Sequence, residues 1–162
     1  KNKIKVRNLK IREKNKRYLL SNLLFFFTGR SRLANKNLLQ QKKNVKKNEL
    51  GLIKLKNSTF QLLEEFYKKK LDLSRIGQIL DDTWKTKKKF TNKISDNYLD
   101  KIYNTALNSG CYGGKLLGAG GGGFFVFVCK KKYHKKVIKR LNKCKKIDFS
   151  FSIYGSSSGL AD

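Results

Sequence analysis

Two short runs of consecutive apolar residues interrupt an otherwise polar chain of 162 residues. They are Leu-Leu-Phe-Phe-Phe at 23–27, which ends at a Thr-Gly pair, and Phe-Phe-Val-Phe-Val at 124–128. An uninterrupted apolar run of this length is typical of a buried strand. At 147–153 apolar and polar residues alternate, which predicts a half-buried strand. Apolar residues at 4, 6 and 9 predict a short edge strand over Lys3–Leu9, followed by a charged helix or linker up to Arg17.

Between the two apolar runs, apolar residues recur at helical spacing. The first predicted helix runs from an N-cap at Ser31 toward Asn48, and the second lies over 52–66. The third begins at Ser74 and ends in three lysines, which suit the negative end of a helix dipole. The fourth runs from about Asp96 to a stop at Gly110, and a short basic helix is predicted over 133–141. The inward-facing residues expected of the first four helices are Leu33, Ala34, Leu38 and Val45; Leu52, Leu55, Leu62, Leu63 and Phe66; Ile76, Ile79, Leu80 and Trp84; and Leu99, Ile102, Tyr103 and Ala106.

The predicted order is therefore strand, four helices, glycine-rich loop, strand, helix, strand. Clustered helices and few, aromatic strands favour an α+β fold, with helices packed on one face of a small sheet. A chain of this length buries one core. No internal repeat and no linker divides it, so we expect one folded domain with at most a small extension.

The formal net charge of +28 is extreme and leaves two interpretations open. One is binding to nucleic acid or another polyanion. The other is a lysine-rich proteome, in which lysine fills any exposed position. Only 7 of the 39 basic residues are Arg, the usual reader of base edges, and the lysines are spread over almost every segment. The aromatic residues fall at predicted core positions, so specific nucleic-acid binding is not favoured, although a basic RNA- or DNA-binding module remains an alternative.

Other features of the composition concern the compartment. No apolar run approaches the roughly 18 residues of a membrane span, and no signal peptide is present. The three cysteines, Cys111, Cys129 and Cys144, are too widely spaced for a zinc site or a disulfide scaffold. Reduced thiols in a cytoplasmic protein fit this pattern. The chain contains no Met, so we expect it to be the C-terminal part of something longer.

The chemically most informative segment is Gly-Ala-Gly-Gly-Gly-Gly at 118–123. Such a run bares backbone N–H groups, which bind phosphate. It satisfies G-x-G-x-x-G, but a dinucleotide site needs a strand before the glycines and a helix after them. Here we predict a helix before and a strand after, with Lys115 close upstream, and no P-loop motif exists elsewhere. A tight turn that merely lets the strand pack is the alternative.

At these residues the sequence resembles the GHMP kinase superfamily, which includes galactokinase, homoserine kinase, mevalonate kinase and phosphomevalonate kinase. Its third motif, K-x-x-G-A-G-G-G-G, is matched by Lys115 to Gly123. Blocks at 24–32, 41–44, 84–88 and 113–120, in that order, resemble the D-glycero-D-manno-heptose 7-phosphate kinase branch. The resemblance spans about residues 3–156.

The resemblance implies a small antiparallel, ferredoxin-like sheet packed against a cluster of helices. It implies a kinase that uses ATP and Mg²⁺ to phosphorylate the anomeric hydroxyl of a heptose phosphate, or of another sugar. The family's P-x-G-x-G-S-S nucleotide motif and its catalytic acid belong to an N-terminal domain that this chain lacks. We therefore expect 1–20 to be the end of that domain or a linker, 21–156 the C-terminal domain, and 157–162 a frayed tail. Without its partner domain the chain is expected to be inactive.

The expected site residues follow from the same resemblance. The phosphate or ATP loop is assigned to Lys115, Gly118, Ala119, Gly120, Gly121, Gly122 and Gly123. Arg30 and Arg32 are candidates for the substrate phosphate, because Arg suits phosphate. No catalytic residue and no metal ligand is assigned within the chain. Trp84 is expected in the core, Lys87 and Lys88 in solvent, and His134 has no assigned role.

Overall fold

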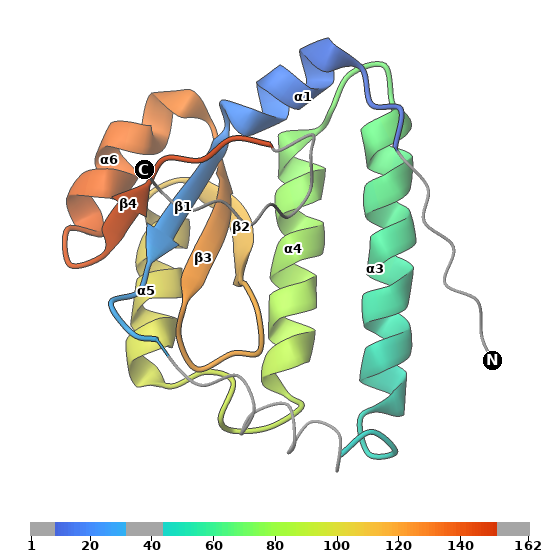
Figure 1. Ribbon diagram of the computed structural model, residues 1–162, viewed down its shortest axis with the longest axis vertical. Helices are drawn as coiled ribbons and strands as arrows, with labels where there is room; N and C mark the ends of the chain where they lie inside the picture. The colour runs from blue at the N-terminus through green and yellow to red at the C-terminus, as the bar shows by residue number, and fades with distance from the viewer. Residues whose placement is uncertain (1–8, 32–43, 152–162) are drawn as a thin grey trace, which may run out of the picture.

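The structure, a computed structural model, describes residues 9–31 and 44–151. Figure 1 shows a small twisted sheet with helices behind it and beside it. The strands are β1 (Leu23–Phe27), β2 (Cys111–Leu116), β3 (Phe124–Cys129) and β4 (Lys145–Ile147). The helices are α1 (Glu13–Leu20), α3 (Glu49–Tyr67), α4 (Leu73–Lys88), α5 (Asn97–Asn108) and α6 (His134–Arg140), with a 3₁₀ turn at Lys131–Tyr133.

The four strands form one antiparallel sheet in the order β2-β3-β1-β4. The two apolar runs, β1 and β3, are confirmed as strands and occupy the centre. Leu23 pairs with Val128, and Phe27 with Phe124. One face of β1 is fully buried and the other is half-buried, so β1 is less enclosed than its uninterrupted apolar sequence predicts.

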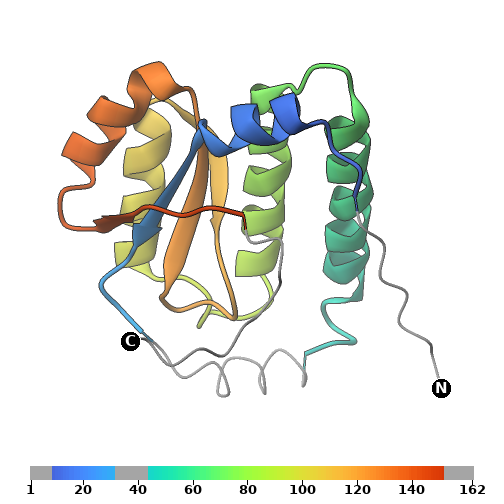
Figure 2. The same cartoon turned by 45° about the horizontal axis from the view of Figure 1, so that its top comes forward.

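The helices are arranged in two groups around this sheet. Figures 1 and 2 show α5 and α6 behind the strands, α4 beside β2, and α3 on the outer side of α4. The predicted α+β architecture, with a small antiparallel sheet against a helix cluster, is therefore confirmed. Asp72 caps α4 by accepting the Ser74 and Arg75 amides, and Asp96 caps α5 by accepting that of Leu99.

The main core lies between the sheet and helices α4, α5 and α6. Trp84 is fully buried, as predicted, and its indole packs edge-on to Phe125 with ring centroids 5.7 Å apart. Tyr103 fills the space between Trp84 and the sheet, and its hydroxyl donates to Asp81 at 2.7 Å. Burial, and then the hydrogen bond with Asp81, raise the pKa of Tyr103. Trp84 is therefore a core residue and not an exposed platform for a sugar.

β2 was missed by the pattern analysis, which treated residues 111–116 as part of a glycine-rich bridge. The strand contains Gly113 and Gly114, residues that normally weaken strands. In the fold both glycines are necessary, because an added Cβ at Gly113 would collide with the Gly77 carbonyl of α4, and one at Gly114 with the Val126 carbonyl. The close approach of α4 to Gly113, and of β3 to Gly114, thus explains why this strand contains two consecutive glycines.

The predicted strand over 147–153 is wrong in its described part. β4 ends at Ile147, and residues 148–151 form no regular structure. Phe149 instead packs its ring on Phe25, with centroids 3.8 Å apart, and Phe151 is exposed. Of the alternating residues that the structure describes, only Ile147 belongs to the sheet, and residues 148–151 continue beyond β4 without pairing.

Three further predictions concern the N-terminal part. The charged stretch before Arg17 forms helix α1, and the 52–66 pattern forms α3. Most of the predicted 31–48 helix and of the Lys3–Leu9 strand lies outside the described residues. Of their described parts, 44–48 is a turn in which Val45 is exposed, and Leu9 is exposed and outside any strand. The inward position predicted for Val45 is wrong.

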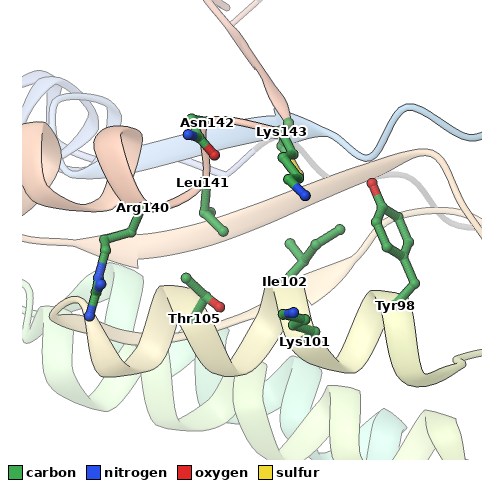
Figure 3. A pocket seen from close by; sticks show the side chains of 9 residues that line it. Tyr98, Lys101, Ile102, Thr105, Arg140, Leu141, Asn142 and Lys143 are labelled. Carbon is green, nitrogen blue, oxygen red and sulfur yellow. The ribbon is translucent and has the colours of Figure 1, made fainter.

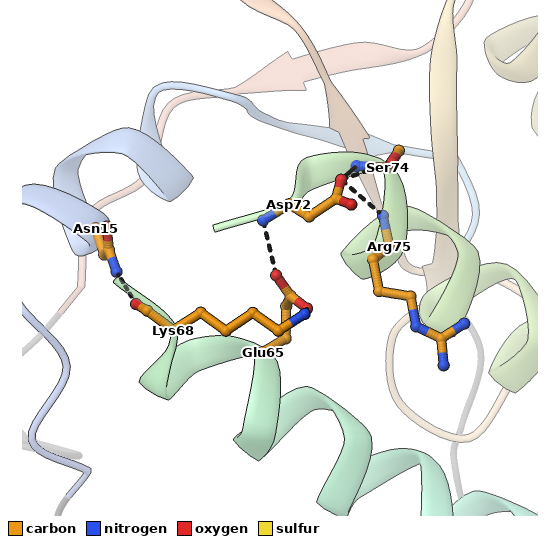
Figure 4. Close-up of polar contacts among 6 residues, drawn as sticks. All are labelled: Asn15, Glu65, Lys68, Asp72, Ser74 and Arg75. Atoms are coloured by element: carbon orange, nitrogen blue, oxygen red, sulfur yellow. Dashed lines mark hydrogen bonds and ion pairs between the residues drawn. The ribbon is translucent and has the colours of Figure 1, made fainter. Parts of the chain in front are cut away.

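The connection between α3 and α4 contains a compact polar cluster, drawn in Figure 4. The carboxylate of Glu65 is 2% exposed, accepts the Asp72 amide at 2.7 Å and pairs with Lys68 at 2.5 Å. Asn15 of α1 donates to the Lys68 carbonyl at 3.0 Å. Each oxygen of the buried carboxylate thus has a partner, and the carboxylate joins α3 to the start of α4. Asn15 adds α1 to the cluster through the Lys68 carbonyl.

No helix within the described ranges is both long and apolar enough to cross a membrane. The three cysteines are all buried and carry free thiols. Cys111 and Cys129 are paired across β2 and β3. The neighbouring Cys129 thiol, and then burial, raise the pKa of Cys111.

Candidate functional site

The glycine-rich segment is the connection of a β-hairpin between β2 and β3. Its two arms are joined by a hydrogen bond from the Leu117 amide to the Phe124 carbonyl at 2.8 Å. A strand therefore precedes the glycines: the predicted helix exists as α5, but β2 separates it from the glycine run, so its expected place directly before the glycines is wrong. Because a strand also follows, a dinucleotide-binding turn remains excluded.

The loop backbone requires glycine. All five glycines, Gly118 and Gly120–Gly123, have positive φ angles between +74° and +156°. Gly120 illustrates the constraint, since its φ is +97° and an added Cβ would lie 2.9 Å from the Ile94 Cα. An added Cβ would meet nothing within 4 Å at Gly118 or at Gly123, but only Gly118 is exposed. One end of the loop is therefore packed and the other is open.

Two neighbouring segments hold the packed end. The Gly123 amide donates to the Arg30 carbonyl at 2.8 Å, and the Gly121 amide to the Ile94 carbonyl at 2.9 Å. Thr28 donates its amide and its hydroxyl to the Gly123 carbonyl, both at 2.9 Å. Two of the loop amides are thus already bonded to protein, so the loop is not the continuous row of bare N–H groups that its sequence suggests. These hydrogen bonds fix the conformation of the loop in the absence of a ligand.

The segment 91–96, which contains Ile94, is a part of the site that the sequence analysis missed. Asn92, Lys93, Ser95 and Asp96 line a small hollow of about 190 Å³ together with Gly121. This polar stretch ends at Asp96, the N-cap of α5. In the sequence, only its position between two helices distinguishes it from other polar segments.

Lys115 lies in β2, three residues before Gly118, and is partly buried. Burial lowers its pKa. Lys87, on the last turn of α4, donates from Nζ to the Gly118 carbonyl. Burial, followed by the nearby charge of Lys115, lowers the pKa of Lys87 as well. The solvated position predicted for Lys87 is wrong, because its side chain reaches the glycine loop.

Lys88 is not solvated either. Its ammonium pairs with Asp100 at 2.9 Å and lies 5.8 Å from the centre of the Trp84 ring. These contacts join the end of α4 to α5. The two adjacent lysines therefore have different environments, which their identical sequence context does not reveal.

Arg30 lies beside the loop, but its guanidinium is already engaged. It pairs with Asp96 at 2.6 Å and stacks over the Tyr98 ring at 4.1 Å. The hydrogen bond from the Leu99 amide, and then the contact with Arg30, lower the pKa of Asp96. The Arg30 side chain thus joins the segment after β1 to α5, whereas its carbonyl holds Gly123. Arg32 lies outside the described residues.

A separate cavity of about 240 Å³ lies between α5 and the segment after α6. Figure 3 shows Tyr98 at one end and Arg140 at the other, with Lys101 and Lys143 along its sides. None of the residues assigned to the glycine loop lines it. It is therefore distinct from the loop site.

Two observations bear on other ligands. In the described part of the chain, no three His, Cys, Asp or Glu side chains gather in a way that could hold a metal ion. The prediction that aromatic residues fall in the core holds only in part, because Tyr18, Phe60, Tyr67, Phe124, Tyr133 and Phe151 are exposed.

Comparison with known proteins agrees with this geometry. The family profile described as GHMP kinases C terminal matches residues 62–147, which include α4, α5, the glycine hairpin and β4. D-glycero-alpha-D-manno-heptose 7-phosphate kinase of Campylobacter jejuni is 31% identical over 140 residues, which make up 83% of this chain and 40% of that protein.

Solved structures show the same fold at lower identity. Mevalonate kinase from L. major aligns with a TM-score of 0.64 and 23% identity, over 74% of this chain and 37% of its own. Phosphomevalonate kinase from Streptococcus pneumoniae aligns with a TM-score of 0.66 and 17% identity, over 76% of this chain and 37% of its own.

The fold and the glycine hairpin are thus those of a C-terminal kinase domain. The chain belongs to the GHMP kinase family and contains that family's C-terminal domain. It spans about 40% of the length of the curated relative.

Proposed function

We propose that this chain is the C-terminal part of an ATP-dependent sugar kinase that phosphorylates a heptose 7-phosphate at its anomeric hydroxyl. The name of the Campylobacter jejuni relative, 31% identical over most of this chain, supports that substrate class. The observation that carries the proposal is the rigid glycine hairpin with a partly buried lysine at its open end.

The hairpin has properties that a phosphoryl-transfer site needs. Catalysis of this reaction depends mainly on positioning and on neutralising charge. The contacts from Arg30 and Ile94 fix the loop before any ligand arrives, so little ordering remains when a phosphate binds. The exposed Gly118 allows close approach, and Lys115 supplies a positive charge.

The remaining functions are assigned to an N-terminal domain. It would hold ATP and Mg²⁺ and supply the catalytic acid, with residues 1–20 as its end or a linker, 21–156 as the C-terminal domain and 157–162 as a tail. This division is consistent with the absence of a metal-ligand cluster from the described residues. The reaction would take place in the cytoplasm, where nucleotide-activated sugars for surface polysaccharides are assembled.

A coupled ADP-release assay with heptose 7-phosphate and Mg-ATP tests the proposal. The isolated chain should show no turnover above background, whereas a protein that carries an N-terminal kinase domain before Lys1 should turn over. Mevalonate and galactose serve as competing acceptors. Turnover by the isolated chain would contradict the division into two domains, and preference for another acceptor would contradict the heptose assignment.

A second candidate, nucleic-acid binding, is favoured by the net charge of +28 and by the exposed aromatic residues. Filter-binding titrations at low and physiological salt distinguish the two. Affinity that collapses as salt rises indicates non-specific counterion release. Nanomolar, sequence-dependent binding that survives physiological salt would replace the kinase proposal.

A further inference from the structure

Two of the cysteines lie directly opposite each other at the base of the glycine hairpin. Cys111 is the first residue of β2 and Cys129 the last of β3, and their Cα atoms are partners in the antiparallel register. Residues opposite each other in such a pair have Cα atoms about 4.5–5.5 Å apart, and a disulfide spans Cα separations of about 4.4–6.8 Å. The register therefore places the two residues within disulfide range.

The two side chains also converge. The Sγ atom of Cys129 lies 3.8 Å from the carbonyl oxygen of Gly110, the residue before Cys111. The thiol of Cys111 donates a hydrogen bond to the sulfur of Cys129, which lowers the pKa of Cys129. Cys129 is fully buried, whereas Cys111, on the edge strand β2, is 8% exposed. The pair is thus shielded from large reagents, and a small one can approach only from the edge of the sheet.

Neighbouring contacts hold the backbone on both sides of the pair. The Cys129 amide donates to the Asn22 carbonyl at 2.8 Å, and the Cys129 carbonyl contacts Nε2 of His134 at 3.0 Å. On the other strand, Gly110 has a φ of +114°, and an added Cβ would lie 2.8 Å from Cγ of Tyr133. Because both backbones are held, the two sulfurs meet at a high effective concentration.

We propose that Cys111 and Cys129 form a reversible disulfide when the chain meets hydrogen peroxide, which closes the base of the glycine hairpin. The Cys129 thiolate attacks one peroxide oxygen, so that an S–O bond forms, the O–O bond breaks and the departing hydroxide takes up a proton to become water. The sulfur of Cys111, after losing its proton, attacks the sulfur of Cys129. The S–S bond forms, the S–O bond breaks and a second water leaves. Each thiol loses one hydrogen, and the peroxide is reduced by two electrons.

The disulfide would change the hairpin in two ways. It closes residues 111–129 into a loop that contains β2, the glycine run and β3, and a cross-link of this kind restricts the unfolded chain and so stabilises the fold. It also consumes the sulfenic acid before further oxidation to sulfinic acid, which is not readily reversed. Neither effect depends on the proposed kinase function.

The test is peptide mapping of the reduced chain after treatment with a small excess of hydrogen peroxide, alkylation and digestion with trypsin without reductant. Cleavage after Lys115 and Lys130 leaves the two cysteines on separate peptides, 102–115 and 116–130, so the cross-link appears as their joined mass. The intact mass should fall by about 2 Da, for two hydrogens, with Cys144 left as the free thiol. Dithiothreitol should reverse the change.

The matched control is Cys144, which is also buried but lines the separate cavity beside Tyr98. Cys144→Ser should cross-link as the wild type does, whereas Cys111→Ser and Cys129→Ser should not. The same oxidation in urea should give a mixture of the three possible pairings, because the selection depends on the folded register. The melting midpoint of the oxidised wild type should lie about 5–10 °C above that of the reduced chain, and Cys144→Ser should show the same gain.

Several results would overturn the proposal. They are a native product linked through Cys144 or between two chains, thiols taken to sulfinic acid without a cross-link, and thiols that stay unreacted under conditions that oxidise them in urea. A cross-link that leaves the melting midpoint unchanged would contradict the closing of the hairpin. Because the wild-type product is mapped directly, the outcome does not depend on whether the serine variants fold.

Discussion

The two ends of α4 differ in how their charges are satisfied. At the N-terminal end, Glu65, Lys68 and Asp72 form a closed network in which a buried carboxylate has a partner for each oxygen. At the C-terminal end, Lys87 and Lys115 are partly buried, and neither forms an ion pair within residues 9–31 and 44–151. The first arrangement stabilises the fold, and the second costs stability in the absence of a ligand. The comparison shows that one helix can have a closed polar network at one end and uncompensated charge at the other.

The largest expected effect is on the closed network. Glu65→Ala should lower the free energy of unfolding by about 2–3 kcal/mol, because it leaves the buried Asp72 amide without an acceptor and opens a cavity. Glu65→Gln keeps that acceptor and should cost roughly half as much. Urea unfolding monitored by Trp84 fluorescence measures both. Equal losses in the two variants would mean that the charge, and not the hydrogen bond, dominates.

Effects of up to the same size are expected within the loop, where the packed and open ends can be compared directly. Gly120→Ala should cost about 2–3 kcal/mol, since a positive φ and a contact with Ile94 both oppose a side chain. Gly118→Ala faces only the backbone strain, about 1 kcal/mol. Thermal unfolding of the two variants provides the measurement, and a cost for Gly118→Ala as large as that for Gly120→Ala would contradict the open-end description.

The Arg30–Asp96 pair provides a pH-dependent test on the loop side. The lowered pKa of Asp96 means that its contribution to stability is present above the ordinary carboxyl pKa of about 4 and is lost as pH falls through the lower folded value. The stability difference between the wild type and Asp96→Asn should therefore shrink from pH 5 or so to about pH 2.

Because both side chains of this pair are about half exposed, the difference at neutral pH should stay below roughly 1 kcal/mol. Melting temperatures measured against pH for the two proteins provide the readout. A gap that stays constant across the acid range would show that Asp96 acts through its capping hydrogen bond alone, which asparagine can supply in part.

The smallest effect is expected for the two unpaired lysines. Lys87→Gln and Lys115→Gln should leave the unfolding free energy within about 0.5 kcal/mol of the wild type or raise it slightly, because each removes like-charge repulsion. Urea unfolding in phosphate-free buffer, beside Glu65→Ala, measures this. Destabilisation comparable to that of Glu65→Ala would remove the contrast between the two ends of α4.

The sequence was most informative where one type of residue dominates a segment. The apolar runs of β1 and β3 can be stable only when buried, which predicts two central strands. The apolar residues of α4 and α5 recur at helical spacing, which predicts two helices with one buried face. Prediction failed at β2 because its glycines are required by tertiary contacts: Gly113 faces Gly77 of α4, 36 residues away, and Gly114 faces the Val126 carbonyl of β3. It failed at Lys87 because a basic helix end is ordinarily solvated.

The sequence by itself determined the α+β class, the central strands, the core position of Trp84 and the family to which the glycine motif belongs. These depend on local periodicity and on a contiguous motif. Only the tertiary structure decided that the glycines form a hairpin held by Arg30 and Ile94, that Arg30 is already paired, and that Lys87 reaches the loop. Those features depend on which distant backbones meet, and hydrogen bonds and unpaired charges are settled only when the chain brings those groups together.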